Sequence, residues 1–136
     1  MSEPVKRGSN AGWREIGGRR IYFRSRWEAN YGKYLQWCKE QGHILEWEHE
    51  PKTFWFESIK RGVRSYLPDF RVYPKESITG SPSAYWVEVK GWLDPKSATK
   101  LKRMAKYYPD EKIKLVKADW FARNNCMMRN LIKGWE

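Results

Sequence analysis

Residues 66–92 constrain the fold of this 136-residue chain more than any other stretch. Inside it, the run Val-Glu-Val-Lys at residues 87–90 alternates apolar and charged side chains. A period of two is typical of a β-strand with one buried face and one open face. Glu88 and Lys90 are therefore expected to point the same way, toward the open side at the end of a strand.

A second β-rich run, residues 66–73, carries Asp69 directly after Pro68. Proline is tolerated at the start or edge of a strand, so Asp69 is expected at a strand end. If the two runs are adjacent strands, Asp69 lies beside Glu88. Two carboxylates and an ammonium group at strand ends suit a hard cation such as Mg²⁺ and the hydrolysis of a phosphodiester. The alternative is an ordinary surface strand with a Glu-x-Lys pair.

The charge balance indicates a polyanionic partner. The chain has 27 Lys and Arg against 16 Asp and Glu, a formal net charge of +11. A strongly basic domain most often binds nucleic acid, although a membrane surface is a competing partner. No apolar run approaches the roughly 20 residues of a spanning helix, so we expect no membrane insertion. Cys38 and Cys126 are expected to be free thiols in a reducing cytoplasm.

A helix is predicted to begin at Ser25 and to end before Gly42. Ser25 followed by Glu28 reads as a capping box, and apolar residues then recur at helical spacing. Glu28 lies at the margin of the buried stripe, so it can cap the helix, face a site, or do both. Residues 1–20, rich in Gly and basic residues, are expected to form a flexible arm, with residues 21–136 as a single domain.

The next segments are predicted to be strands at residues 44–50 and 53–56 and a loop at residues 75–83. The acidic side chains of the first strand, Glu46, Glu48 and Glu50, are interpreted as surface residues. His43 and His49 are interpreted as structural or surface histidines without a role in a site. A further strand is expected at residues 113–116, followed by a packing helix within residues 119–135.

A basic helix is predicted to begin at Asp94-Pro95, because aspartate is a good N-cap and proline is favoured in the first turn. The cations crowded on this helix favour a DNA-facing surface. Together with the N-terminal arginines, the expected DNA-binding residues are Arg19, Arg20, Arg24, Lys96, Lys100 and Arg103.

The order of these features resembles the phage endonuclease I family of Holliday-junction resolvases, within the PD-(D/E)xK nuclease superfamily. The resemblance covers residues 22–117 and is carried by three motifs, namely Phe23-Arg24-Ser25 with Glu28, Tyr66-Leu67-Pro68-Asp69-Phe70, and Val87-Glu88-Val89-Lys90-Gly91-Trp92. It implies an α/β fold in which helices flank a mixed central sheet, with a restriction-endonuclease-like core. The loop between Asp69 and Glu88 is longer than the family pattern leads us to expect.

The resemblance also implies roles for individual residues. Asp69 and Glu88 would be the main metal ligands, the backbone carbonyl of Val89 another ligand, Glu28 the third acidic residue of the site, and Lys90 the catalytic lysine. The cofactor would be Mg²⁺, with Mn²⁺ as a substitute. The family forms homodimers that exchange N-terminal segments, which would place a crossing near residues 50–53.

The expected function is metal-dependent resolution of four-way junctions and other branched DNA by paired nicks, in the cytoplasm of a phage-infected bacterial host. One alternative is another PD-(D/E)xK endonuclease, directed at transposon ends or at a DNA sequence. The other is a basic DNA-binding module without catalytic activity.

Overall fold

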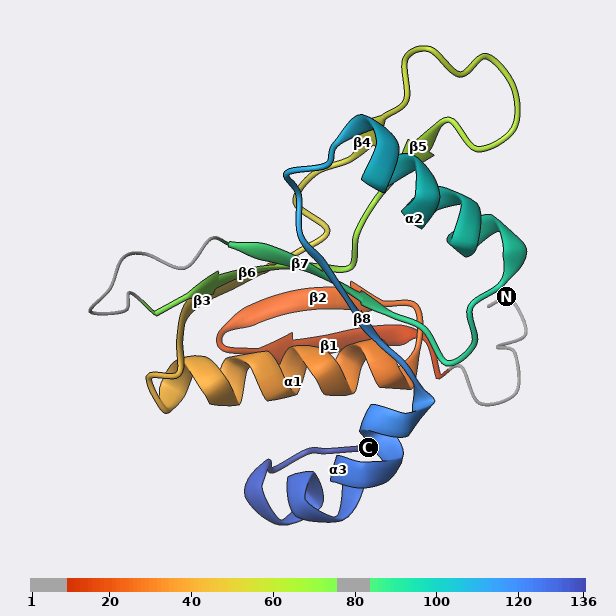
Figure 1. Ribbon diagram of the computed structural model, residues 1–136. Helices are drawn as coiled ribbons and strands as arrows, with labels where there is room; N and C mark the ends of the chain where they lie inside the picture. The colour runs from red at the N-terminus through yellow and green to blue at the C-terminus, as the bar shows by residue number, and fades with distance from the viewer. Residues whose placement is uncertain (1–9, 76–83) are drawn as a thin grey trace.

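A four-stranded mixed sheet forms the centre of the computed structural model, which describes residues 10–75 and 84–136 (Figure 1). Three neighbouring strands are antiparallel and the fourth is parallel to the third. In spatial order they are β3 (Ile44–His49), β6 (Phe70–Pro74), β7 (Tyr85–Val89) and β8 (Ile113–Val116). The prediction of an α/β fold with a mixed central sheet flanked by helices is confirmed. The loop expected at residues 75–83 lies outside the described residues except for Lys75.

Helices and a small hairpin cover the two faces of this sheet. Helices α1 (Arg26–Glu40) and α3 (Ala118–Leu131) contribute to the larger apolar cluster on one face. Helix α2 (Pro95–Tyr107) packs on the other face with the short strands β4 (Phe54–Trp55) and β5 (Ser65–Tyr66). The two predicted helix starts are confirmed, because Ser25 Oγ accepts from Glu28 N at 3.1 Å and Asp94 Oδ1 accepts from Ser97 N at 2.8 Å.

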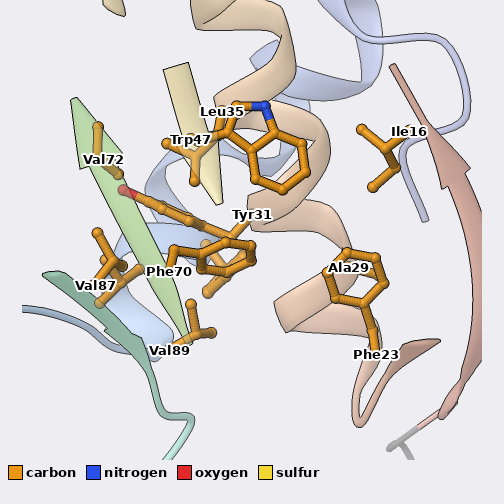
Figure 2. Packing of buried hydrophobic residues seen from close by; sticks show 12 residues of the cluster. Ile16, Phe23, Ala29, Tyr31, Leu35, Trp47, Phe70, Val72, Val87 and Val89 are labelled. Atoms are coloured by element: carbon orange, nitrogen blue, oxygen red, sulfur yellow. The ribbon is translucent and has the colours of Figure 1, made fainter. Parts of the chain in front are cut away.

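Aromatic side chains fill the larger cluster (Figure 2). The rings of Trp47 and Phe70 meet edge to face with centroids 5.9 Å apart, and Tyr31 of α1 lies 5.8 Å from Phe70. All three side chains are buried. Aromatic pairs at these separations add to the stabilisation that their large buried area supplies, which holds α1 on the sheet.

The expectation of a flexible arm at residues 1–20 is wrong from Gly12 onward. Strands β1 (Gly12–Ile16) and β2 (Arg19–Phe23) form an antiparallel hairpin. Gly17 and Gly18, with φ of 59° and 79°, supply the two positive φ values that a tight two-residue turn requires. Ile16 and Phe23 are buried, so the hairpin is anchored in the core. Residues 1–9 of the expected arm lie outside the described residues.

Both faces of β7 are covered, which differs from the expectation of one open face. Val87 and Val89 belong to the larger cluster, whereas Trp86, on the opposite face, packs in the smaller cluster with Met104 of α2. The alternation itself was predicted correctly. The β4–β5 hairpin and α2 cover the face of β7 that the sequence pattern predicts to be open. Glu88 is therefore only 7% exposed.

Candidate active site

Three carboxylates from separate elements meet at one end of the central sheet. Asp69 directly precedes β6, Glu88 is in β7, and Glu28 is in the first turn of α1. The antiparallel register sets Phe70 opposite Val87, which brings Asp69 to the level of Glu88. The exposed fractions of Glu28, Asp69 and Glu88 are 5%, 6% and 7%. Charged groups are rarely buried to this degree without a charged partner or a bound ion.

Asp69 is anchored to the backbone of the neighbouring strand. Its Oδ2 accepts from Val89 N at 2.7 Å, which also places the Val89 backbone directly at this carboxylate. Burial, followed by the negative charges of Glu88 and Glu28, raises the pKa of Asp69 well above its ordinary value. A hydrogen bond with the Glu28 carboxylate adds to this rise. Among the described residues, the backbone N–H of Val89 opposes it.

Glu88 is held by a tyrosine that the sequence reasoning did not assign to the site. The buried hydroxyl of Tyr66 donates to Glu88 Oε2 at 2.7 Å. Burial raises the pKa of Glu88, while the hydrogen bond from Tyr66 and the charges of Lys90 and Lys100 oppose that rise. Burial and the adjacent Glu88 charge raise the pKa of Tyr66, so this tyrosine remains a donor.

Lys90 lies at the mouth of the site. Its Nζ is 3.9 Å from Glu88 Oε1 and 4.0 Å from Asp94 Oδ2, and a third of its side chain is exposed. Asp94 is the N-cap of α2, so the start of this helix is tied to the lysine. The ammonium group is thus held between two carboxylates and remains accessible from solvent.

Glu28 turns its carboxylate toward the chain that precedes α1. Its Oε2 accepts from Arg24 N at 3.1 Å, instead of reaching back to Ser25 N as in a complete capping box. Burial alone would raise the pKa of Glu28, but hydrogen bonds with His49 and Asp69 and from Arg24 N lower it on balance. Of the two readings of Glu28, the geometry supports the site-facing one.

His49 and Glu50, to which the sequence pattern assigned no role, lie beside Glu28. His49 Nε2 lies 3.4 Å from Glu28 Oε2 and 3.7 Å from Glu50 Oε1. One donor atom from each of Glu28, His49 and Glu50 lies within 4.8 Å of the other two, so this group could bind a metal ion. The strand alternation misplaced Glu50 because its φ of +47° takes the chain out of the β conformation directly after β3. Unusual backbone at such a position is common in functional sites.

The expected DNA-binding residues differ in their contacts within the protein. Arg19 lies over the Trp47 ring at 4.1 Å and donates to Trp47 O, and Arg24 pairs with Glu50 at 3.1 Å. Arg103 donates to Val63 O, and the charge of Lys100 acts on Glu88. Lys96 is exposed, and Arg20, also exposed, lies over the Trp13 ring at 4.8 Å. Several of these cations therefore have contacts within the protein itself.

No protein-family model and no curated protein matches this chain. Within residues 10–75 and 84–136, none of the helices has the length and apolar character needed to cross a membrane. A functional assignment must therefore be argued from the geometry of the site.

Proposed function

We propose that this protein is a metal-dependent endodeoxyribonuclease with a restriction-endonuclease-like core, and that four-way DNA junctions are its first candidate substrate. The observation that carries the proposal is the burial of Glu28, Asp69 and Glu88 together, with Lys90 at the mouth of their site. The net charge of +11 supports a DNA substrate.

The residues at the site fit a divalent cation. Buried like charges repel one another, and the raised pKa of Asp69 reflects that repulsion. All the donors at Asp69, Glu88 and the Val89 carbonyl are oxygen atoms, which Mg²⁺ prefers and Mn²⁺ accepts. These three groups would hold the ion, with Glu28 as the third carboxylate. When bound, such an ion acidifies a coordinated water and neutralises charge on the phosphate.

The chain's own residues would orient the reacting groups. Tyr66 fixes Glu88 Oε2 and Val89 N fixes Asp69 Oδ2, so each carboxylate keeps its second oxygen for a ligand. Lys90 Nζ, close to Glu88 Oε1, would hold a phosphate oxygen or the attacking water beside that carboxylate. Burial of the carboxylates by the β4–β5 hairpin and α2 would exclude bulk water from one side of the reaction.

A homodimer remains part of the proposal, because two intact duplexes are produced from a junction only when two strands are nicked. Twofold symmetry is the commonest arrangement for such an assembly. Glu28 lies with Asp69 and Glu88 of its own chain, so a complete site does not require exchange of α1 between subunits. An exchange through residues 50–53 would preserve the same contacts between chains.

The test is to incubate the protein with four-way, duplex and single-stranded DNA, with and without Mg²⁺. We expect paired nicks in the junction only when Mg²⁺ is present. Glu88→Gln should abolish cleavage, whereas Glu136→Gln, the same change in a glutamate that pairs with Arg14 and Lys33, should not. Cutting of duplex alone would favour a sequence- or end-directed nuclease. Binding without cleavage by a folded protein would favour a DNA-binding module.

A further inference from the structure

Glu28 has two different neighbourhoods. On one side are Asp69 and Glu88, the oxygen-only group of the proposed nuclease centre. On the other side are the imidazole of His49 and the carboxylate of Glu50. The second neighbourhood contains a nitrogen donor and is not used in the proposed function.

The spacing of the second group suits ligands of one ion. Bonds of about 2.0–2.2 Å to nitrogen and oxygen place neighbouring ligand atoms about 3.0–3.5 Å apart around a four- or six-coordinate cation. The separations of 3.4 Å and 3.7 Å from His49 Nε2 to the two carboxylates lie within a few tenths of an ångström of that range. They are longer than a good N–H···O hydrogen bond of about 2.7–3.2 Å.

A second observation points to a missing positive charge at this place. Glu28 and Asp69 are both more than nine-tenths buried, and their carboxylates interact with each other. Among the described side chains, the basic group that approaches Glu28 is the imidazole of His49, and the structure gives Asp69 a backbone N–H as its donor. An ion held by Glu28 would reduce the repulsion within this buried pair.

His49 borders a surface hollow, and its ring is held in place. The hollow is lined by Arg19, Arg20, Ile21, Tyr22, Glu48, His49 and Pro51. The imidazole lies between Phe23 and Phe70, at centroid distances of 4.8 Å and 5.5 Å. Packing of this kind fixes the direction in which Nε2 points.

The salt bridge that now occupies Glu50 is weak enough to be displaced. Arg24 approaches Glu50 Oε1 at 3.1 Å, but its side chain is 65% exposed. Solvent screens an ion pair with an exposed partner, so the pair stabilises the fold only slightly and a metal–carboxylate bond readily replaces it. Arg24 would then be released toward solvent.

We propose that Glu28, His49 and Glu50 form a second cation site that adjoins the nuclease centre and prefers borderline ions such as Co²⁺ or Zn²⁺ to Mg²⁺. The preference follows from the imidazole ligand, because Mg²⁺ favours oxygen donors whereas later divalent ions accept nitrogen. The catalytic meaning of this site rests on the proposed function, but the binding of an ion does not, since it is measured without DNA.

Cobalt is the probe, and the chain supplies its own control. It contains two histidines, of which His43 is exposed on the loop before β3. Co²⁺ should shift the ring resonances of His49 in nuclear magnetic resonance spectra of the wild-type protein, with the two histidines assigned by means of His43→Gln. His49→Gln should weaken Co²⁺ binding by about tenfold or more, and His43→Gln should leave it unchanged. Mg²⁺ binding should change little in either variant.

The wild-type spectra keep the test decisive even if His49→Gln folds poorly. His49 resonances that do not respond to saturating Co²⁺ would overturn the site, as would a folded His49→Gln variant that binds Co²⁺ like the wild type. That result would leave His49 as a hydrogen-bond partner of Glu28. A protein that binds Co²⁺ through His49 but cuts no DNA would retain the site and refute the nuclease. A protein that cuts DNA but does not bind Co²⁺ through His49 would retain the nuclease and refute the site.

Discussion

The carboxylates of Asp69 and Glu136 are the same chemical group in opposite surroundings. Glu136 Oε1 pairs with Arg14 at 2.7 Å, and its Oε2 lies 2.9 Å from Arg14 Nε and 2.7 Å from Lys33 Nζ. The hydrogen bond from Arg14 is the main cause that lowers the pKa of Glu136, to about 2. Asp69 instead faces Glu88 and Glu28, and its pKa is raised.

The surroundings of Glu136 and of Asp69 therefore have different effects on the folded protein. The contacts of Glu136 join the C-terminal residue to β1 and α1, and they need no further ligand. Burial and the neighbouring carboxylates disfavour the ionised form of Asp69, so a proton or a cation at this place would stabilise the folded chain. A structural site does not require repulsion between buried carboxylates. Such repulsion therefore marks these carboxylates as a candidate active site.

The largest expected effect is on DNA cleavage. Asp69→Asn keeps an acceptor for Val89 N but removes the charge, so cleavage of the junction should fall about a thousandfold or more, as when an essential group of a catalytic unit is lost. Glu136→Gln makes the same chemical change in a carboxylate outside the site and should leave the rate within about twofold. Single-turnover cleavage measures both. Near-wild-type cutting by folded Asp69→Asn would remove Asp69 from the site.

The next effect is on stabilisation by metal. An ion that binds only the folded state at 100 times its Kd stabilises that state by about 2.7 kcal/mol. Thermal unfolding with Mg²⁺ and with a chelator should therefore show a higher Tm with Mg²⁺ in the wild type and in Glu136→Gln. Asp69→Asn should lose most of this difference. Equal Mg²⁺ stabilisation in all three proteins would place the ion elsewhere.

Without divalent cations, the two substitutions should have opposite signs. Because the folded-state pKa of Asp69 is raised, its surroundings favour folding most below its ordinary pKa of 3.8 and oppose folding increasingly as pH rises. At pH 7, Asp69→Asn should stabilise the chelated protein by about 1 kcal/mol, and this gain should vanish near pH 3. Urea unfolding across that range measures it. A loss of stability at pH 7 would mean that the charge is already compensated.

The smallest effect concerns Glu136. Its side chain is 32% exposed, so solvent screens the pairing, and Glu136→Gln should cost about 1 kcal/mol at pH 7. Since the folded-state pKa is depressed to about 2, this stabilisation is present above the ordinary value of 4.5 and is lost as pH falls through 2. The difference in unfolding free energy between the wild type and Glu136→Gln should become smaller as pH falls from 4.5 to about 2. A difference independent of pH would show that packing, not charge, holds the C-terminal residue.

Local signals in the sequence were sufficient for several parts of this protein. Ser25 and Asp94 mark the starts of α1 and α2, because a cap depends on residues within one helical turn. The alternation at residues 87–90 predicted a strand, and Pro68-Asp69 predicted a second carboxylate beside Glu88. These features depend on near neighbours or on one pairing of adjacent strands.

The tertiary structure alone decided how the site is completed. Tyr66 meets Glu88 and His49 meets Glu28 across sequence separations of 22 and 21 residues, which no local period records. The positive φ of Glu50 takes its side chain out of the alternation that assigned it to the surface. The second face of β7 is likewise covered by α2 and the β4–β5 hairpin, which pack on it from other parts of the chain. The sequence by itself therefore determined which residues carry charge and where α1, α2 and the central strand β7 lie. The burial that turns those charges into a candidate site arose only when distant segments packed together.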